Sequence, residues 1–204
     1  LLINYNKNLF EVYCFSSFKR SDELNSEIRN SVDKFIDLHE TGDDEIIKLV
    51  SQYNLDSSKD FISILPGSRE SEISQLMPVY IEAAKKLLQS NSNAYFLIPA
   101  ANKKLAEKIQ STQGLDELPH KLLIHSAQDF LSLSPVSIVT SGTASLEAAV
   151  LGSVPIICYK TNMLNYAILS RLIKTPFIGL PNLLLQEHIF PELIQNDLTS
   201  DSIV

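Results

Sequence analysis

The chain has 204 residues, of which 45% are hydrophobic and 20% are charged, and its formal net charge at pH 7 is −7. This length and apolar content are enough to bury one sizeable core. Because the balance is acidic and the basic residues do not form long clusters, the electrostatic surface that nucleic acids require is excluded, and we expect no nucleic-acid partner.

Residues 1–58 are predicted to form an irregular and helical segment ahead of the main domain. A helix over about residues 22–35 is predicted because apolar side chains recur there at helical spacing, at Leu24, Ile28, Val32 and Phe35. Acidic residues at the start of the 43–53 segment predict a second, short helix. Residues 1–45 carry no motif to which we assign a function.

From residue 59 to residue 204 the pattern predicts a single α/β domain with a doubly wound parallel sheet. Its short apolar runs are typical of strands that are buried on both faces. The predicted strands are 61–65, 94–98, 121–124, 136–140 and 154–158. The predicted helices are about 72–90, 102–111, 126–133, 143–151 and 162–173. In such a sheet, ligands bind at the carboxyl ends of the strands.

The strand at 61–65 ends in a tight turn, Pro66-Gly67-Ser68-Arg69. Gly67 permits the turn, Ser68 is exposed by it, and Arg69 supplies a guanidinium suited to a pyrophosphate or a carboxylate. This turn is a candidate anion-facing loop. The alternative is an ordinary strand-to-helix turn with Arg69 as a solvated surface charge.

The strand at 136–140 is followed by a similar turn, Ser141-Gly142-Thr143, and then by an apolar helical run. Unpaired amides at the start of that helix, together with its dipole, favour a negatively charged ligand. Glu147 lies one turn into the helix, where it can stabilise the helix start or accept hydrogen bonds from a ribose diol. Neither turn has the Gly-x-Gly-x-x-Gly or the P-loop pattern, which disfavours a typical dehydrogenase or P-loop NTPase.

Three residues in the last third of the chain have both a ligand-binding and a structural interpretation. Lys160, at the end of a strand, can contact a phosphate or sugar hydroxyl, or remain solvated. Asn182 follows a proline and can contact a ligand or cap a local turn. Glu192 can stabilise the start of a helix.

The cysteines and histidines give no indication of a metal site or of a cofactor. Cys14 and Cys158 are far apart in the sequence and show no Cys-x-x-Cys or Cys/His ligand spacing. The four histidines show no metal-ligand spacing either, so each histidine is interpreted as a surface or edge residue. Unpaired cysteines favour a cytoplasmic protein. The sequence has neither an apolar stretch of membrane-spanning length nor a signal-peptide pattern.

Several motifs taken in order resemble the lipid-A-disaccharide synthase family of inverting GT-B glycosyltransferases. The resemblance covers roughly residues 60–198 and is much more specific than any one motif. The motifs are Leu65-Pro-Gly-Ser-Arg-x-x-Glu-Ile73, Ser141-Gly-Thr-Ala-Ser-Leu-Glu-Ala148, Pro155-x-x-x-Tyr-Lys160, Leu180-Pro-Asn-Leu-Leu184 and Pro191-Glu-Leu-Ile-Gln195.

The resemblance implies that this chain is the C-terminal, UDP-binding half of such an enzyme, with a Rossmann-like fold. Arg69 would face the pyrophosphate, Ser141 and Thr143 would offer it hydroxyls and amides, Glu147 would hold the ribose, and Asn182 would line the donor cleft. No metal or other cofactor is implied. The catalytic base would lie in an N-terminal domain, so no catalytic residue is assigned.

The implied reaction joins UDP-2,3-diacylglucosamine to 2,3-diacylglucosamine 1-phosphate and releases UDP. The implied enzyme is bacterial and cytoplasmic, either free or in peripheral contact with the inner membrane. Because the chain starts at Leu1 and stops at a helix-cap pattern around Thr199, Ser200 and Asp201, we expect a fragment that is inactive alone.

Two other functions remain open from the sequence. A different UDP-sugar enzyme of GT-B type, such as a peptidoglycan-type N-acetylglucosaminyl transferase or a UDP-sugar epimerase, would use a similar nucleotide cleft. A UDP-binding module without catalysis would also fit, because fold alone does not determine function.

Overall fold

The computed structural model describes residues 13–16, 34–37, 42–161 and 176–204. The chain divides into two compact units, Leu1–Leu55 and Asp56–Val204. The predicted helix at 162–173 lies outside the described residues.

Among its described residues, the N-terminal unit has two short strands and one helix. Strands β1 (Tyr13–Ser16) and β2 (Lys34–Asp37) pair in parallel, with Cys14 opposite Phe35. The helix predicted over residues 22–35 is wrong at Lys34 and Phe35, which belong to β2, because strand pairing with a distant segment overrides local helical spacing. The rest of that prediction lies outside the described residues. Helix α2 (Gly42–Gln52) confirms the predicted short helix.

The second unit is built on a six-stranded sheet in which all neighbouring strands are parallel. The order across the sheet is β5 (His120–Ile124), β4 (Ala94–Ala100), β3 (Asp60–Leu65), β6 (Val136–Thr140), β7 (Val154–Tyr159) and β8 (Glu192–Ile194). The five predicted strands are confirmed. Strand β8 was not predicted, because three residues are too few to show a periodic pattern.

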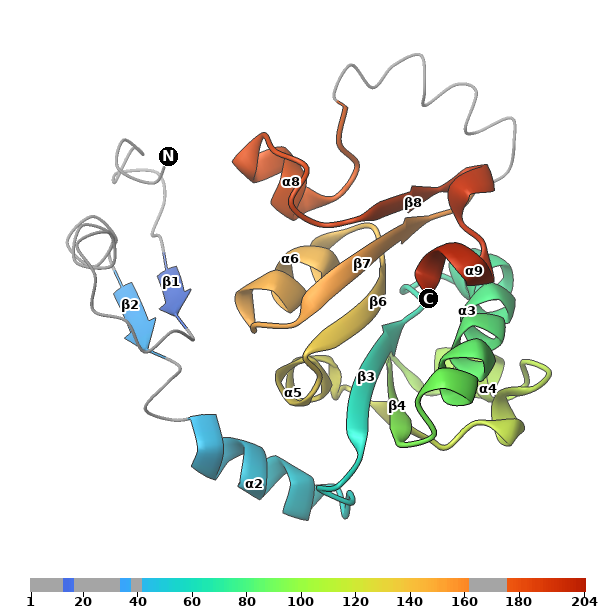
Figure 1. The fold of residues 1–204 in the computed structure, drawn as a ribbon, viewed down its shortest axis with the longest axis horizontal. Helices are drawn as coiled ribbons and strands as arrows, with labels where there is room; N and C mark the ends of the chain where they lie inside the picture. The colour runs from blue at the N-terminus through green and yellow to red at the C-terminus, as the bar shows by residue number, and fades with distance from the viewer. Residues whose placement is uncertain (1–12, 17–33, 38–41, 162–175) are drawn as a thin grey trace. The chain divides into compact units, whose positions relative to one another are not determined.

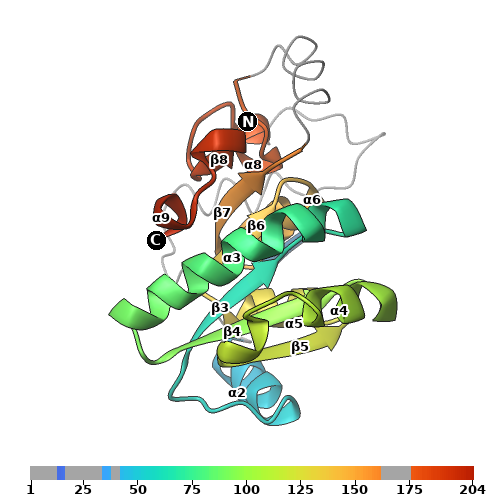
Figure 2. The same cartoon turned by 90° about the vertical axis from the view of Figure 1, so that its right-hand side faces the viewer.

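Helices cover both faces of this sheet, as predicted for a doubly wound fold (Figures 1 and 2). Helices α3 (Glu70–Ser90), α4 (Lys103–Gln110) and α9 (Ser200–Ile203) pack on one face, and Figure 2 looks onto α3. Helices α5 (Ala127–Leu133) and α6 (Thr143–Val150) pack on the other. A further short helix, α8 (Leu180–Leu185), contacts α6.

The core is divided by the sheet into two layers, because successive side chains of a strand point to opposite faces. Ile64 and Ile138 belong to the layer under α3 and α4. Their neighbours Leu65 and Val139 belong to the layer under α5 and α6. Each fully buried aliphatic side chain of this size stabilises the fold by about 1.5–3 kcal/mol. The continuous apolar runs of the sequence follow from this two-sided burial.

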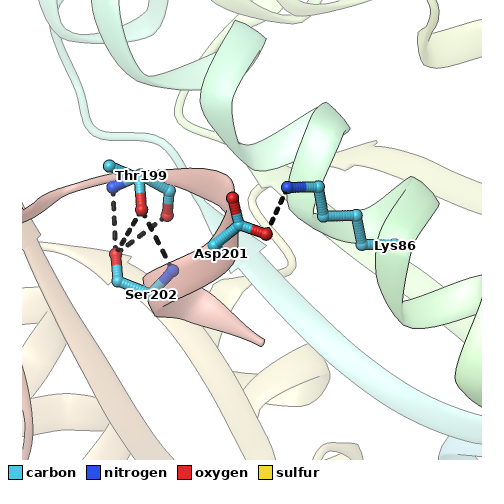
Figure 3. A network of polar contacts seen from close by, with 4 residues as sticks. All are labelled: Lys86, Thr199, Asp201 and Ser202. Atoms are coloured by element: carbon cyan, nitrogen blue, oxygen red, sulfur yellow. Dashed lines mark hydrogen bonds and ion pairs between the residues drawn. The ribbon is translucent and has the colours of Figure 1, made fainter.

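A short helix, α9, follows the cap pattern with which the sequence was expected to stop, and Figure 3 shows the capping contacts. Oγ1 of Thr199 accepts a hydrogen bond from the amide of Ser202 at 3.1 Å, and the Ser202 hydroxyl accepts one from the amide of Thr199 at 3.0 Å. This reciprocal capping box satisfies N–H groups that the first turn leaves unpaired. Thr199 is therefore the cap, and Ser200 and Asp201 lie in the helix.

Helix α9 is held against α3 by polar and apolar contacts. The carboxylate of Asp201 pairs with the ammonium of Lys86, in α3, at 2.5 Å (Figure 3). Both side chains are exposed, so this ion pair contributes little stability. Leu198 and Ile203, which are 3% and 5% exposed, belong to the core layer under α3. Their burial accounts for most of the attachment of α9.

Candidate functional site

A cavity of about 530 Å³ opens at the carboxyl ends of the strands of the second unit. Strands β3 and β6 are adjacent in the sheet. The strands that follow β3 in the chain, β4 and β5, lie on one side of this pair, and the strands that follow β6, β7 and β8, lie on the other. This is the topological switch point, where the loops that follow two neighbouring strands diverge and leave a crevice. The cavity is lined by residues 65–68, 99–101, 127–129 and 142–144, together with Glu72, His125 and Glu147.

The start of α6 forms one wall of the cavity. Its N-cap, Gly142, has no side chain that could accept hydrogen bonds from the first turn of the helix. At φ +154° the backbone favours glycine, and a Cβ added there would have no atom within 4 Å. An anion can therefore approach the first-turn amides and the dipole of α6 without obstruction. The ends of the two strands are tied together, because the Thr140 hydroxyl donates to the carbonyl of Leu65 at 3.1 Å.

The loop after β3 forms the opposite wall, and its anion-binding groups already have a partner. Gly67 adopts φ +103°, a conformation that L-residues rarely adopt. The amides of Ser68 and Arg69 both donate to Oε2 of Glu72, at 3.0 and 3.1 Å. The Arg69 guanidinium donates to Oε1 of the same carboxylate at 2.8 Å. The side chain of Arg69 is 77% exposed, and Arg69 does not line the cavity.

The structure brings some of the predicted site residues together and separates others from them. Gly67, Ser68, Gly142, Thr143 and Glu147 all line the cavity. Glu147 is exposed on α6. Arg69, Ser141, Lys160 and Asn182 are not among the lining residues. The hydroxyl of Ser141 donates to the carbonyl of Ile178 at 3.1 Å, and Lys160 is half-buried just beyond the end of β7.

Asn182 is a structural residue of α8 in this fold. Its side chain is 0% exposed, and its amide nitrogen donates to the carbonyl of Phe190 and to Oε1 of Glu192, both at 2.8 Å. Its amide oxygen accepts from the amides of Ile189 and Phe190 at 3.1 and 2.9 Å. All the hydrogen-bonding positions of the amide are used, so none is left for a ligand.

Glu192 stabilises the start of a helix, as one interpretation of the sequence predicts, but that helix is α8, which precedes it in the chain. Its carboxylate accepts hydrogen bonds from the amides of Ile178 and Gly179 at 2.9 and 3.0 Å. Gly179 is the N-cap of α8. A carboxylate at a helix N-terminus is favourable because it pairs the unsatisfied amides and complements the dipole.

Four cavity residues with polar side chains were not among the predicted site residues. Glu72 was part of a recognised motif, and its spacing three residues after Arg69 is that of a capping box. His125, at φ +57°, directly follows β5, and Gln128 and Asp129 lie in the first turn of α5. For His125, Gln128 and Asp129, the sequence feature that could have indicated a site was their position after the carboxyl end of a strand.

Cys158 does not serve as a nucleophile in this fold. The thiol lies in the core, and burial raises its pKa to about 12. At neutral pH it therefore stays protonated, and only the thiolate is nucleophilic. Among the described residues, no cluster of His, Cys, Asp and Glu side chains has the geometry to hold a metal ion.

The profile of the Lipid-A-disaccharide synthetase family matches residues 36–203. The chain belongs to this family. The match confirms the predicted resemblance and extends further toward the N-terminus than the 60–198 range on which that prediction was based. It also includes the last two residues of strand β2, in the N-terminal unit.

Curated relatives of the family agree with this assignment. The chain is 37% identical over 151 residues to a lipid-A-disaccharide synthase of Alcanivorax borkumensis, covering 74% of this chain and 39% of that protein. It is 39% identical over 152 residues to the enzyme of Hahella chejuensis, covering 72% and 38%. The chain thus spans about two fifths of the length of these relatives.

A solved structure with the same fold is the ADP-heptose lps heptosyltransferase II of E. coli. The TM-score is 0.56 at 14% sequence identity, over 79% of this chain and 49% of that one. This likeness confirms the predicted fold, a Rossmann-like half of a GT-B glycosyltransferase. Within the described part of this family member, no helix combines the length and apolar character needed to span a bilayer.

Proposed function

We propose that this chain is the donor-binding half of a lipid-A-disaccharide synthase. The enzyme would join UDP-2,3-diacylglucosamine to 2,3-diacylglucosamine 1-phosphate and release UDP. The observation that carries the proposal is the cavity at the switch point, where Gly67, Ser68, Gly142, Thr143 and Glu147 meet. Family membership supports this choice of substrates over those of other UDP-sugar enzymes. We place the enzyme in the cytoplasm. Because the substrates carry acyl chains, we also propose a peripheral contact with the inner membrane.

The diphosphate of the donor would bind between the two glycine turns. The amides at the start of α6 and the hydroxyl of Thr143 would receive its oxygens on one side, and Arg69 would reach it from the other. Transfer of the sugar leaves negative charge on UDP, and donors positioned in advance stabilise that charge as it develops. This stabilisation does not require a metal ion.

The ribose would lie beside Glu147. Within the described part of the chain, the carboxylate of this residue accepts no hydrogen bond, and it lines the cavity one turn after Thr143. An ionised carboxylate is an acceptor only, and a ribose diol offers it two hydroxyl donors. Lys160 and Ser141 would lie in the cleft around this cavity.

Binding of UDP to this chain tests the proposal. We expect UDP to bind, and we expect Arg69→Ala to weaken binding by about 1.5–3 kcal/mol, because a charge-assisted contact to the diphosphate is lost. Isothermal titration calorimetry measures both affinities. The matched control is Lys103→Ala, which removes an exposed cation that faces Glu107 instead of the cavity and should leave the affinity unchanged. Equal UDP affinity in wild type and Arg69→Ala would mean that Arg69 is a solvated surface charge and does not bind the diphosphate.

The proposed role of Glu147 predicts a dependence on the ribose hydroxyls. UDP should bind more tightly than its 2′,3′-dideoxy analogue by about 1–2 kcal/mol, and Glu147→Ala should abolish this preference. Titrating UDP and its dideoxy analogue into the wild type and into Glu147→Ala gives the four affinities from which the preference of each protein is calculated. If Glu147→Ala kept the full preference for the hydroxyls, the residue would only stabilise the start of α6.

A further inference from the structure

The carboxylate of Glu72 occupies the amides that an incoming phosphate would use. One oxygen, Oε2, accepts from the amides of Ser68 and Arg69 at 3.0 and 3.1 Å, and the other accepts from the Arg69 guanidinium at 2.8 Å. The loop after β3 therefore already binds an anion, and that anion belongs to the chain itself.

The shape of the loop is that of an anion-binding concavity. Successive amides converge on a single oxygen, as in the backbone nests that bind phosphates. Gly67 allows the close approach, because a Cβ at this position would clash with Oε2 of Glu72. Its φ of +103° turns the chain so that the following amides point inward.

The charged side chains that line the cavity are acidic. The carboxyl groups of Glu72, Asp129 and Glu147 line the cavity, and among its described lining residues none is a lysine or an arginine. A diphosphate that entered this arrangement would lie close to carboxylates such as that of Glu147, which repel it. The cation nearest in sequence to the amides is Arg69, and its guanidinium is held by Glu72.

We propose that the carboxylate of Glu72 competes with the diphosphate of the nucleotide for the amides of Ser68 and Arg69 and for the guanidinium of Arg69. When the ligand binds, a phosphate oxygen replaces Oε2 at the amides of Ser68 and Arg69, and the guanidinium exchanges the carboxylate for the phosphate. Glu72 then turns toward the cavity opening. When UDP leaves, the carboxylate returns and closes the loop, which favours product release. The inference rests on the proposed function and adds a residue that sets the affinity for the diphosphate part of the ligand.

Glu72→Gln tests this competition, because the amide keeps the size of the side chain but removes its charge. A neutral acceptor holds the two amides and the guanidinium less strongly, so UDP should bind about three- to tenfold more tightly. The affinity for uridine, which has no phosphate, should stay the same. Calorimetry with UDP, and ligand-detected NMR with uridine, measure the two affinities in each protein.

The control for a general charge effect is Glu70→Gln. Glu70 lies in the same helical turn, but its carboxylate pairs with Lys104 at 2.5 Å and does not contact the loop amides. We expect this variant to bind UDP as the wild type does. Glu72→Asp serves as a second variant, since its shorter side chain retains the charge but withdraws it from the amides, and UDP should again bind more tightly.

Three results would overturn the inference. Unchanged or weaker UDP binding in both Glu72 variants, with uridine binding intact, would make Glu72 a fixed support for Arg69 and leave the proposed function standing. An equal gain in Glu70→Gln would reduce the effect to net charge. If neither UDP nor uridine bound to the wild type or to the variants, the proposed function would fail, and the inference with it.

Discussion

This 204-residue chain, assayed alone, is expected to release no UDP from UDP-2,3-diacylglucosamine in the presence of the acceptor. The chain spans about two fifths of the length of its curated relatives, and its cavity lies at one edge of one sheet. Glycosyl transfer requires an acceptor hydroxyl held against the donor and a base that removes its proton. Loss of both contributions lowers the rate by many orders of magnitude, so the expected activity is at background.

The assay measures UDP release over time with the chain alone and after mixing with the part of a lipid-A-disaccharide synthase that this chain does not span. Activity only in the mixture would support the proposed division of labour between the two parts. Turnover by the chain alone would contradict it. The catalytic base would then have to be sought among the titratable cavity residues, and His125, Asp129 and Glu147 would be the first candidates.

Asn182→Ala is expected to lower the free energy of unfolding by about 2–4 kcal/mol, because several hydrogen bonds of one buried amide are lost together. The substitution removes the side chain that pairs with the amides of Ile189 and Phe190 and with the carbonyl of Phe190, and it removes one hydrogen bond to Glu192. Urea unfolding, followed by circular dichroism, measures the change. Asn196→Ala, at an exposed position, is the control and should change stability by less than about 0.5 kcal/mol.

The UDP affinity of Asn182→Ala separates its two interpretations. Because Asn182 does not line the cavity, we expect the folded variant to bind UDP like the wild type. A variant of normal stability that had lost UDP affinity would contradict this expectation. It would place Asn182 at the donor cleft, as the family resemblance implies.

The strands of the sheet could be predicted because each is buried on both faces and therefore appears in the sequence as a short apolar run. This holds for β4 and β6, whose central residues are at most 1% exposed, and for most of β3, in which Ser63 and Ile64 are 0% exposed. Strand β8 lacks the pattern, since its residues are half-buried and one of them is Glu192. Strand β2 was mistaken for the end of a helix because its pairing with β1 bridges about 20 residues and leaves no local periodicity.

Of the candidate site, only the two glycine turns and the kind of ligand that suits them could be predicted from the sequence. Gly67 and Gly142 indicated where the chain must turn tightly, and both line the cavity. The partners of polar side chains were not predictable in the same way. Arg69 and Glu72 are close in sequence, and either could have faced a ligand. Their mutual ion pair depends on the fold of the loop, which places the carboxylate over the amides.

The sequence by itself determined the alternation of strands and helices, the position of both glycine turns at strand ends, and the family. These follow from local periodicity, from the conformations open to glycine, and from the order of short motifs. Only the tertiary structure decided that β3 and β6 are neighbours, so that the two turns share one cavity. It also decided that Asn182 supports α8 and that Glu72 occupies the loop amides. Such contacts depend on long-range strand pairing and on competition between partners in space, which local sequence patterns do not record.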